Sequence, residues 1–201
     1  MNEELEATAE VQGNPPDEEQ TAHEEKIAEL TKTAREQMAK KRWEDALKTY
    51  AQVLTLQQQA GDRVGIAKVK NDMASVYLAQ REWQQALDLL EHSREIFTTA
   101  GDPEQESVAL NNMAAAQYEL GDWKQALEHY ETALSIRREM DDQVGEAKTL
   151  RNIGMLYAKQ GNMMKAKIYL NHAVAVAKRA KSPQMIKIIR KSLSQLGRRR
   201  R

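Results

Sequence analysis

A period of 40 residues runs through most of the sequence and constrains the fold more than any other feature. Trp43, Trp83 and Trp123 lie 40 residues apart, and Met163 takes the fourth place. Three further columns keep this spacing, namely Ala46, Ala86, Ala126 and Ala166; Ala34, Ala74, Ala114 and Gly154; and Tyr50, Leu90, Tyr130 and Leu170. Columns that share one period indicate tandem repeats, in which each unit stacks on its neighbours.

Each repeat has the pattern of a helix, a tight turn and a second helix. Apolar residues recur at helical spacing on both sides of a break, which falls at residues 80–82 in the second repeat and contains Gly121 or Gly161 later. Gly permits the left-handed residue that ends many helices. Only 9 Gly and 4 Pro occur in 201 residues, which is typical of a helical protein. The small columns allow two helices to cross closely.

These columns resemble those of the tetratricopeptide repeat (TPR). Small residues stand at the crossing positions, an aromatic residue follows the turn, and Ala and an aromatic residue or Leu come next. The usual unit has ~34 residues, and the longer unit here resembles the subclass found in kinesin light chains and spindle-orientation adaptors. Residues 110–114 and 121–127 are similar to a kinesin light chain repeat in particular. The resemblance implies an all-α, right-handed α-solenoid of four TPR-like helix pairs and a C-terminal capping helix.

The expected organisation has four parts. Residues 1–21 form a disordered acidic segment, because they are highly charged and poor in apolar residues. The repeats follow, residues 184–196 form an amphipathic capping helix, and residues 197–201 form an Arg tail. The boundaries expected for the repeats, which together fill residues 22–183, are 22–61, 62–101, 102–141 and 142–183.

A formal net charge of zero hides a strong asymmetry along the chain. The first 25 residues contain nine acidic side chains and no Lys or Arg, whereas no Asp or Glu follows Glu146. In the TPR family the first helices of the pairs line a concave groove that grips targets, so the resemblance implies a basic, Asn-rich groove here. The residues expected in it are Lys32, Arg35, Lys68, Asn71, Asp72, Asn111, Asn112, Tyr118, Lys148, Arg151, Asn152, Met155 and Lys159.

The residue types of this groove predict a partner. An Asn side chain offers an acceptor and two donors, so a row of Asn residues suits the backbone of an extended peptide. Neighbouring Lys and Arg residues favour acidic side chains or a terminal carboxylate. We therefore expect a non-catalytic scaffold, an adaptor or assembly factor, that binds an extended, acidic protein segment. The acidic N-terminal segment of the chain itself, called the acidic head below, is a second candidate ligand for the same groove.

Other classes of site find no support in the sequence. The chain has no Cys, and its four His residues lack the three- or four-residue spacing of helical metal ligands. No Gly-rich phosphate loop or nucleophile elbow is present, so we expect no enzyme, metal or cofactor. Met residues, Met164 among them, are expected to fill the core because several coincide with buried columns.

The basic C-terminal region supports an alternative. Lys187, Arg190, Lys191 and residues 198–201 could bind nucleic acid or an anionic membrane through charge alone, or serve as an import signal. The start of the sequence lacks the pattern of a secretory signal, and a cytoplasmic location is expected. Self-association of the chain is a further open alternative. Exposed apolar surface for it is expected at Trp43, because the nearby turn carries Lys41 where a Gly is expected.

Overall fold

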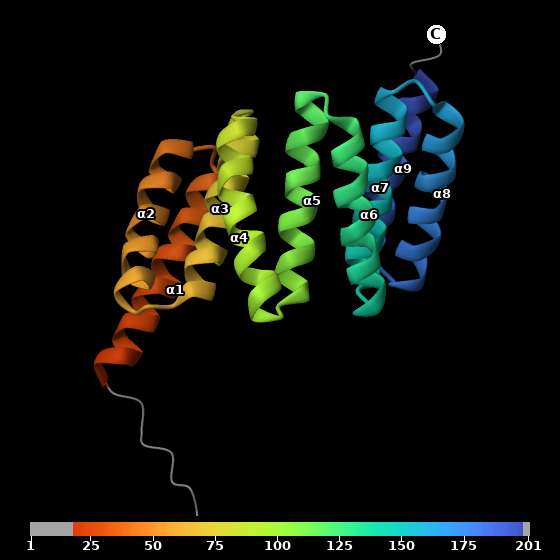
Figure 1. Ribbon diagram of the computed structural model, residues 1–201. Coiled ribbons are helices and arrows are strands. Elements are labelled where there is room, and N and C mark those ends of the chain that lie inside the picture. The colour runs from red at the N-terminus through yellow and green to blue at the C-terminus, as the bar shows by residue number, and fades with distance from the viewer. Residues whose placement is uncertain (1–17, 199–201) are drawn as a thin grey trace, which may run out of the picture.

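Nine α-helices fill residues 18–198, which are the residues that the computed structural model describes, and no strand occurs among them (Figure 1). The all-α architecture is confirmed. The helices follow one another in pairs along the molecule and are α1 (Glu18–Ala39), α2 (Trp43–Gln59), α3 (Arg63–Gln80), α4 (Trp83–Ala100), α5 (Pro103–Leu120), α6 (Trp123–Glu139), α7 (Gln143–Lys159), α8 (Met163–Arg179) and α9 (Pro183–Arg198).

The two end helices are longer than expected. Helix α1 begins at Glu18, so residues 18–21 are helical and the expected disorder is wrong for them; the nearest helix-stopping residues are Pro15 and Pro16. Helix α9 begins at Pro183, since Pro suits the first helical position, where no backbone N–H is needed. The rest of the acidic segment, and residues 199–201 of the Arg tail, lie outside the described residues.

All eight turns between helices have the same backbone hydrogen bonds. At the first turn the N–H of Arg42 donates to the carbonyl of Gln37 at 2.9 Å, and the N–H of Lys41 donates to Met38 at 3.0 Å. This pair of bonds is the Schellman motif, which requires a left-handed residue. Four turns place Gly there, at positions 61, 101, 121 and 161, and the other four place Lys41, Arg81, Asp141 and Lys181.

Most helices after the first begin with a side-chain cap. Asp62, Asp102, Asp122, Asp142 and Asn162 each accept a hydrogen bond from the backbone N–H three residues later. Such a cap satisfies one of the free donors at the helix start. The turns that precede α2 and α4 carry Arg42 and Glu82 instead, without a side-chain cap. Helix ends are therefore specified most strongly in the last two repeats.

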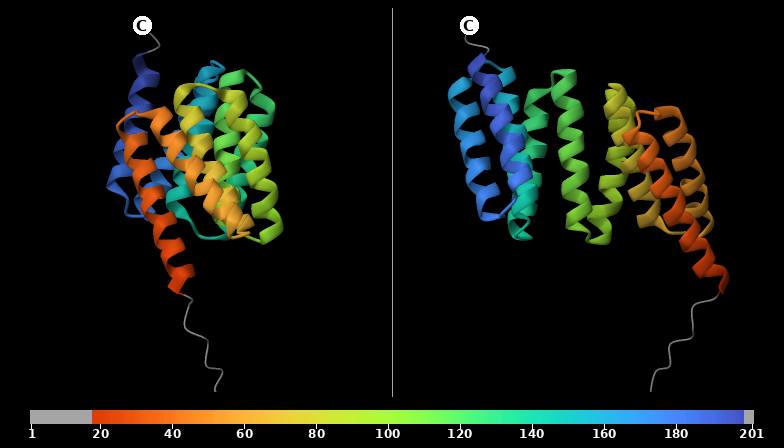
Figure 2. Two further views of the ribbon diagram at one scale, coloured as in Figure 1. Left: turned by 90° about the vertical axis from the view of Figure 1, so that its left-hand side faces the viewer. Right: turned by 180° about the vertical axis from the view of Figure 1, so that it is seen from behind.

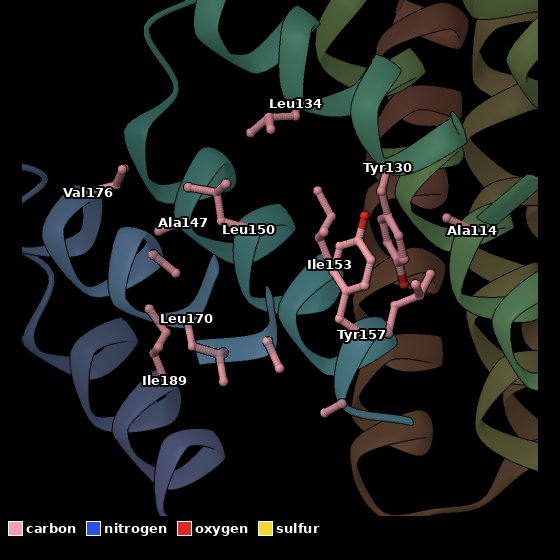
Figure 3. Close-up of a cluster of buried hydrophobic side chains, with 14 of the residues drawn as sticks. Ala114, Tyr130, Leu134, Ala147, Leu150, Ile153, Tyr157, Leu170, Val176 and Ile189 are labelled. Carbon is pink, nitrogen blue, oxygen red and sulfur yellow. The ribbon is translucent and has the colours of Figure 1, made fainter. Parts of the chain in front are cut away.

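The columns read from the sequence form the core. Ala46, Ala86, Ala126 and Ala166 are fully buried, as are Ala34, Ala74 and Ala114. The largest cluster joins α5 through α9, and Figure 3 shows Tyr130, Leu150, Tyr157, Leu170 and Ile189 within it. Its members come from neighbouring repeats, so burial at the junctions holds the array together.

One face of each first helix packs against the preceding repeat. On α3, α5 and α7 the three positions of this face hold buried or half-buried residues, namely Val69, Met73 and Val76; Ala109, Met113 and Ala116; and Thr149, Ile153 and Leu156. The corresponding residues of α1 are Glu29, Thr33 and Glu36, and all three are exposed. The outer face of α1 is therefore polar, as terminal faces of repeat arrays are.

The α6–α7 junction has a polar core. Arg137, only 3% exposed, donates hydrogen bonds to the Gly145 carbonyl at 2.7 Å and to Thr149 Oγ1 at 2.6 Å. In the preceding repeat the same two columns hold Phe97 and Ala109, both fully buried. A polar pair has replaced an apolar pair at equivalent places, and its hydrogen bonds compensate the burial of the guanidinium.

The array is bowed. In the left view of Figure 2, α1 and α9 lie to the left, whereas the green helices of the middle repeats lie to the right. Along the row, α3 contacts α5, α5 contacts α7, and α7 contacts α9, while the second helices of the described pairs make no comparable contacts with one another. The first helices therefore line the inner side, and α9 continues their row.

Candidate peptide-binding groove

All the residues expected in the groove lie on first helices. Lys32 and Arg35 belong to α1, Lys68, Asn71 and Asp72 to α3, Tyr118 and its Asn neighbours 111 and 112 to α5, and the other five to α7. The structure brings most of them into two groups. One group spans α5, α7 and α9 at the C-terminal half of the row, and the other spans α1 and α3.

A chain of side-chain hydrogen bonds crosses the C-terminal half. Asn152 Nδ2 donates to Asn111 Oδ1 at 3.1 Å, and a terminal guanidinium nitrogen of Arg151 donates to Asn152 Oδ1 at 3.2 Å. Arg151 Nε also donates to Ser192 Oγ of α9 at 2.9 Å. Three consecutive first-row helices are thus joined by polar side chains, which fixes the orientation of Arg151 and Asn152.

A hollow of about 420 Å³ opens beside this chain. Tyr118, Arg151, Asn152 and Met155 line it together with Leu78, Ala115 and Glu119, and the aromatic rings of Trp83 and Tyr130 contribute to its wall. Burial raises the pKa of Tyr130 well above its usual value, so its phenol stays neutral and acts as a donor or acceptor. The hollow offers polar groups beside apolar surface, which is the usual composition of a binding pocket.

Two cations of α7 form no ion pair with any carboxylate of the described residues. Arg151 is half-buried, burial lowers its pKa, and its hydrogen bonds within the described residues go to neutral oxygens. Lys148 is exposed as a whole residue, yet desolvation of its ammonium group and the nearby cations Arg137 and Arg151 lower its pKa, against an opposing effect of Asp142. An anion placed here would gain from both cations.

In the N-terminal half, Arg35 is compensated by a carboxylate. Arg35 and Asp72 form an ion pair at 3.1 Å, and this pairing raises the pKa of Arg35. Burial raises the pKa of Asp72, and Arg35 offsets only part of that effect. The pair lines a hollow of about 390 Å³ that Lys68 also borders. Lys32 is exposed on the neighbouring surface of α1.

A third contact closes one edge of the C-terminal half. Lys159 Nζ lies 3.1 Å from Glu119 Oε2 and 4.0 Å from the centre of the Tyr118 ring. This lysine is therefore held by α5 through a carboxylate and a cation–π contact. A ligand would meet it as part of the groove wall and not as a free charge.

The Asn residues differ in depth. Asn71 and Asn111 are 5% and 4% exposed, so they support the floor, whereas Asn112 and Asn152 are half-buried. Asn71 Oδ1 is buried without a hydrogen-bond partner among the described residues. Asn112 makes no side-chain hydrogen bond to another groove residue within the described part of the chain, so it lies on the same helix as Asn111 but outside the polar chain.

Sequence reasoning missed Ser192 and Glu119. Ser192 lies 41 residues after Arg151, the same offset that separates Asn111 from Asn152, and this repeated offset was the available signal. Glu119 lies 40 residues before Lys159, so the two opposite charges occupy one column of neighbouring repeats.

The fold and the groove define a helical-repeat solenoid of the kind that binds other proteins. The family model of the tetratricopeptide repeat matches residues 37–99 and 105–179, which together are more than half of the chain. The chain belongs to the tetratricopeptide repeat family, and it is a protein–protein interaction scaffold. No curated protein matches the sequence.

Solved structures share the fold at low sequence identity. A Rap protein complexed with Competence and Sporulation Factor is 15% identical with a TM-score of 0.72 over 86% of this chain and 50% of that one. Aspartyl phosphate phosphatase F from Bacillus subtilis is 16% identical with a TM-score of 0.71, and the match covers 88% of this chain and 48% of that one. A putative kinesin light chain from Podosopora anserina, with TPR-like repeats, is 17% identical with a TM-score of 0.64, and the match covers 84% of this chain and 87% of that one. The chain thus spans about half the length of the first two.

A helix that crosses a bilayer needs about 20 consecutive, mainly apolar residues. Within residues 18–198, no helix is both long and apolar enough to do so.

Proposed function

We propose that this chain is a non-catalytic adaptor or assembly factor that binds an extended, acidic segment of another protein along its first-helix row. The observation that carries the proposal is the group on α7, where Arg151 and Asn152 are held in place by neighbours and Arg151 has no carboxylate partner among the described residues.

The charges favour one half of the groove over the other. Arg35 and Lys159 already contact Asp72 and Glu119, so an incoming carboxylate would have to displace a partner there. Arg151 and Lys148 require no such displacement, and charge-assisted bonds to a carboxylate are stronger than bonds between neutral groups. The acidic part of the ligand therefore lies over α7, and its course toward α1 passes Lys68 and Lys32.

The Asn residues hold the ligand backbone. Asn112 and Asn152 keep part of their surface exposed, and each has donors and an acceptor suited to a peptide group. Asn111 acts from below by orienting Asn152, and buried Asn71 lies at the floor of the N-terminal half. Tyr118 and Met155 give the hollow apolar surface for one ligand side chain.

A capture experiment from native extract tests this function. We compare the wild-type chain with Asn112→Ala/Asn152→Ala, each with and without residues 198–201, and use Asn171→Ala on the exposed face of α8 as the matched control. The proposed groove is supported if specific proteins are retained equally by wild type and the control. Their retention should fall at least about tenfold with the double variant and should not depend on residues 198–201.

The alternative is charge-driven binding of nucleic acid or an anionic membrane by the basic C-terminal region. Lys187, Arg190 and Lys191 of α9 are exposed, which favours it. In that case retention requires residues 198–201, ignores the Asn substitutions, and falls steeply as salt is raised. The acidic head, as a competing intramolecular ligand, is tested by whether deletion of residues 1–17 increases retention.

A further inference from the structure

The fourth repeat differs from the other three on its outward face. The second residue of each second helix is Glu44, Gln84, Lys124 and then Met164, and the sixth is Lys48, Asp88, Glu128 and then Ile168. All eight residues are exposed. The first three repeats therefore show that both positions accept polar residues. Among the four second helices, only α8 carries large apolar residues there.

These two residues are the most exposed large apolar side chains of the described residues. Met164 is 76% exposed and Ile168 is 60% exposed, so the expectation that Met164 fills the core is wrong. They stand one helical turn apart and form a single stripe on α8. Half-buried Tyr169 borders the stripe and stacks on Tyr157 with ring centres 5.4 Å apart, so the surface beside it is firmly packed.

The surroundings of the stripe are basic. Lys165 and Lys167 are exposed between and beside the two apolar residues, and Lys178 and Arg179 are exposed in the last turn of the same helix. No acidic residue follows Glu146 in the sequence, and Glu131 of α6, which lies near Tyr169, is accompanied there by Arg138. Lys165 Nζ lies 4.9 Å from the centre of the Tyr157 ring, so this cation lies over the tyrosine pair that borders the stripe.

We propose that this face of α8 is a second docking surface, and that its partner is a helical protein segment with aliphatic residues one turn apart and carboxylates beside them. Apolar residues of the partner cover Met164 and Ile168, and its carboxylates meet Lys165 and Lys167. A narrow stripe with flanking charges of one sign fits an amphipathic helix of the opposite sign.

Two other occupants fit less well. A second copy of the chain would bring the Lys residues of one α8 against those of another, and like charges repel. An anionic membrane would accept the charges, but polar Asn171 and His172 follow the stripe on the same helix and limit what can enter the bilayer. The surface lies on a second helix, away from the first-helix row, so this inference is independent of the proposed function.

The test uses a designed helical peptide with two leucines one turn apart, flanked by glutamates, and a version with lysines in place of the glutamates. Binding to the full chain is measured by fluorescence anisotropy. Met164→Lys/Ile168→Glu installs the residues of the third repeat at both sites, and Lys124→Gln/Glu128→Gln alters the same positions of α6 as the matched control. Lys167→Glu leaves the stripe intact and reverses one charge.

We expect the acidic peptide to bind wild type and the α6 control equally, and to bind Met164→Lys/Ile168→Glu and Lys167→Glu at least about tenfold more weakly, as the lysine peptide does. Asn112→Ala/Asn152→Ala keeps the affinity for this peptide, which separates the two surfaces. The proposal is overturned if the acidic peptide does not bind or binds both α8 variants like wild type. It is also overturned if Met164→Lys/Ile168→Glu leaves peptide binding unchanged and removes only binding to phosphatidylserine vesicles. The same holds if that variant removes only self-association, measured by sedimentation.

Discussion

At the scale of single residues, the close crossing of helices α7 and α8 depends on Gly154. A Cβ atom added there would lie 2.8 Å from Leu170 Cγ and 3.2 Å from the carbonyl oxygen of Ala166. The other repeats hold Ala34, Ala74 and Ala114 in this column. Helices α7 and α8 therefore approach each other within a space that has no room for a methyl group unless Leu170 moves.

Substitution Gly154→Ala should lower the free energy of unfolding by about 1 kcal/mol. Ala favours a helix over Gly by about 1 kcal/mol, but overpacking in a tight core costs about 1–3 kcal/mol and outweighs that gain. Urea unfolding followed by circular dichroism measures the difference. Ala79→Gly on the exposed face of α3 calibrates the helical preference alone, and a gain of stability in Gly154→Ala would show that the crossing relaxes.

His129 gives the chain a pH dependence with a defined sign. Burial lowers its pKa, Arg94 lowers it further, and Glu128, Glu91 and Asp122 oppose the shift. Its Nδ1 lies 2.8 Å from Gln117 Oε1. Because the unfolded chain has the ordinary His pKa of about 6.5, it takes up more protons than the folded chain as pH falls through and below that value.

We expect this contribution to stability to be complete above about pH 6.5 and to be lost as pH falls through the lower pKa of the folded state. Wild type should therefore lose more stability than His129→Gln between pH 7.5 and pH 5.5, values chosen about one unit either side of the ordinary His pKa. Exposed His92 is the control, and His92→Gln should follow wild type. Equal pH dependence in wild type and His129→Gln would contradict the assignment.

At the scale of elements, the turns show how far sequence reasoning reaches. The 40-residue period and the Gly residues predict helix pairs and their breaks, because helix ends follow from local backbone chemistry. The period places Lys41 and Arg81 in the column of Gly121 and Gly161, and Asp141 and Lys181 in the column of Gly61 and Gly101, but these residue types by themselves do not indicate a left-handed conformation. That conformation accompanies the Schellman hydrogen bonds that end the preceding helix.

Non-Gly residues in these turns should reduce stability. A left-handed conformation costs a residue with a Cβ atom roughly 1–2 kcal/mol, and Gly avoids this cost but loses more freedom on folding. Lys41→Gly and Arg81→Gly should each raise the free energy of unfolding by about 0.5–1 kcal/mol, measured by urea unfolding. Gly121→Ala, the reverse change at an equivalent turn, should lower it; a loss in the Lys41 and Arg81 variants would mean that their side chains stabilise the turn.

The groove was only partly predictable at the element scale. Helical spacing assigns Asn71, Asn111 and Asn152 to one face, but it does not give depth, and the structure buries the first two. Ion pairs such as Arg35 with Asp72 join residues 37 positions apart, so they depend on how neighbouring helices are set against each other. Arg35 is paired in this way, whereas Arg151 and Lys148 of α7 form no ion pair with a carboxylate of the described residues.

At the scale of the whole molecule, the two ends of the array have different surfaces. The outer face of α1 presents Glu29, Thr33 and Glu36, whereas α9 covers the last helix pair with Ile189 and Leu196 buried. Neither surface resembles the apolar faces that join the repeats. Trp43, the residue at which exposure for self-association was expected, is half-buried. It packs against the core cluster of α1, α2 and α3 that contains Ala34, Ala46 and Tyr50.

Giving α1 the residues of α3 should create a joining face. Glu29→Val/Thr33→Met/Glu36→Val copies Val69, Met73 and Val76 onto the exposed surface of α1. We expect concentration-dependent association in sedimentation velocity that wild type lacks under the same conditions, because an exposed apolar face of this size favours contact. Identical sedimentation of both chains would show that these positions do not define the joining face.

The measurement that tests the central claim most directly is a map of amide chemical-shift changes in the isotope-labelled full chain on titration with an extended glutamate-rich peptide. The account predicts that the changes centre on Lys148, Arg151 and Asn152 of α7 and extend to the facing residues of α5 and α9, and that they disappear in Asn112→Ala/Asn152→Ala. Changes confined to the outward faces of the second helices, or changes that persist in that variant, would contradict it.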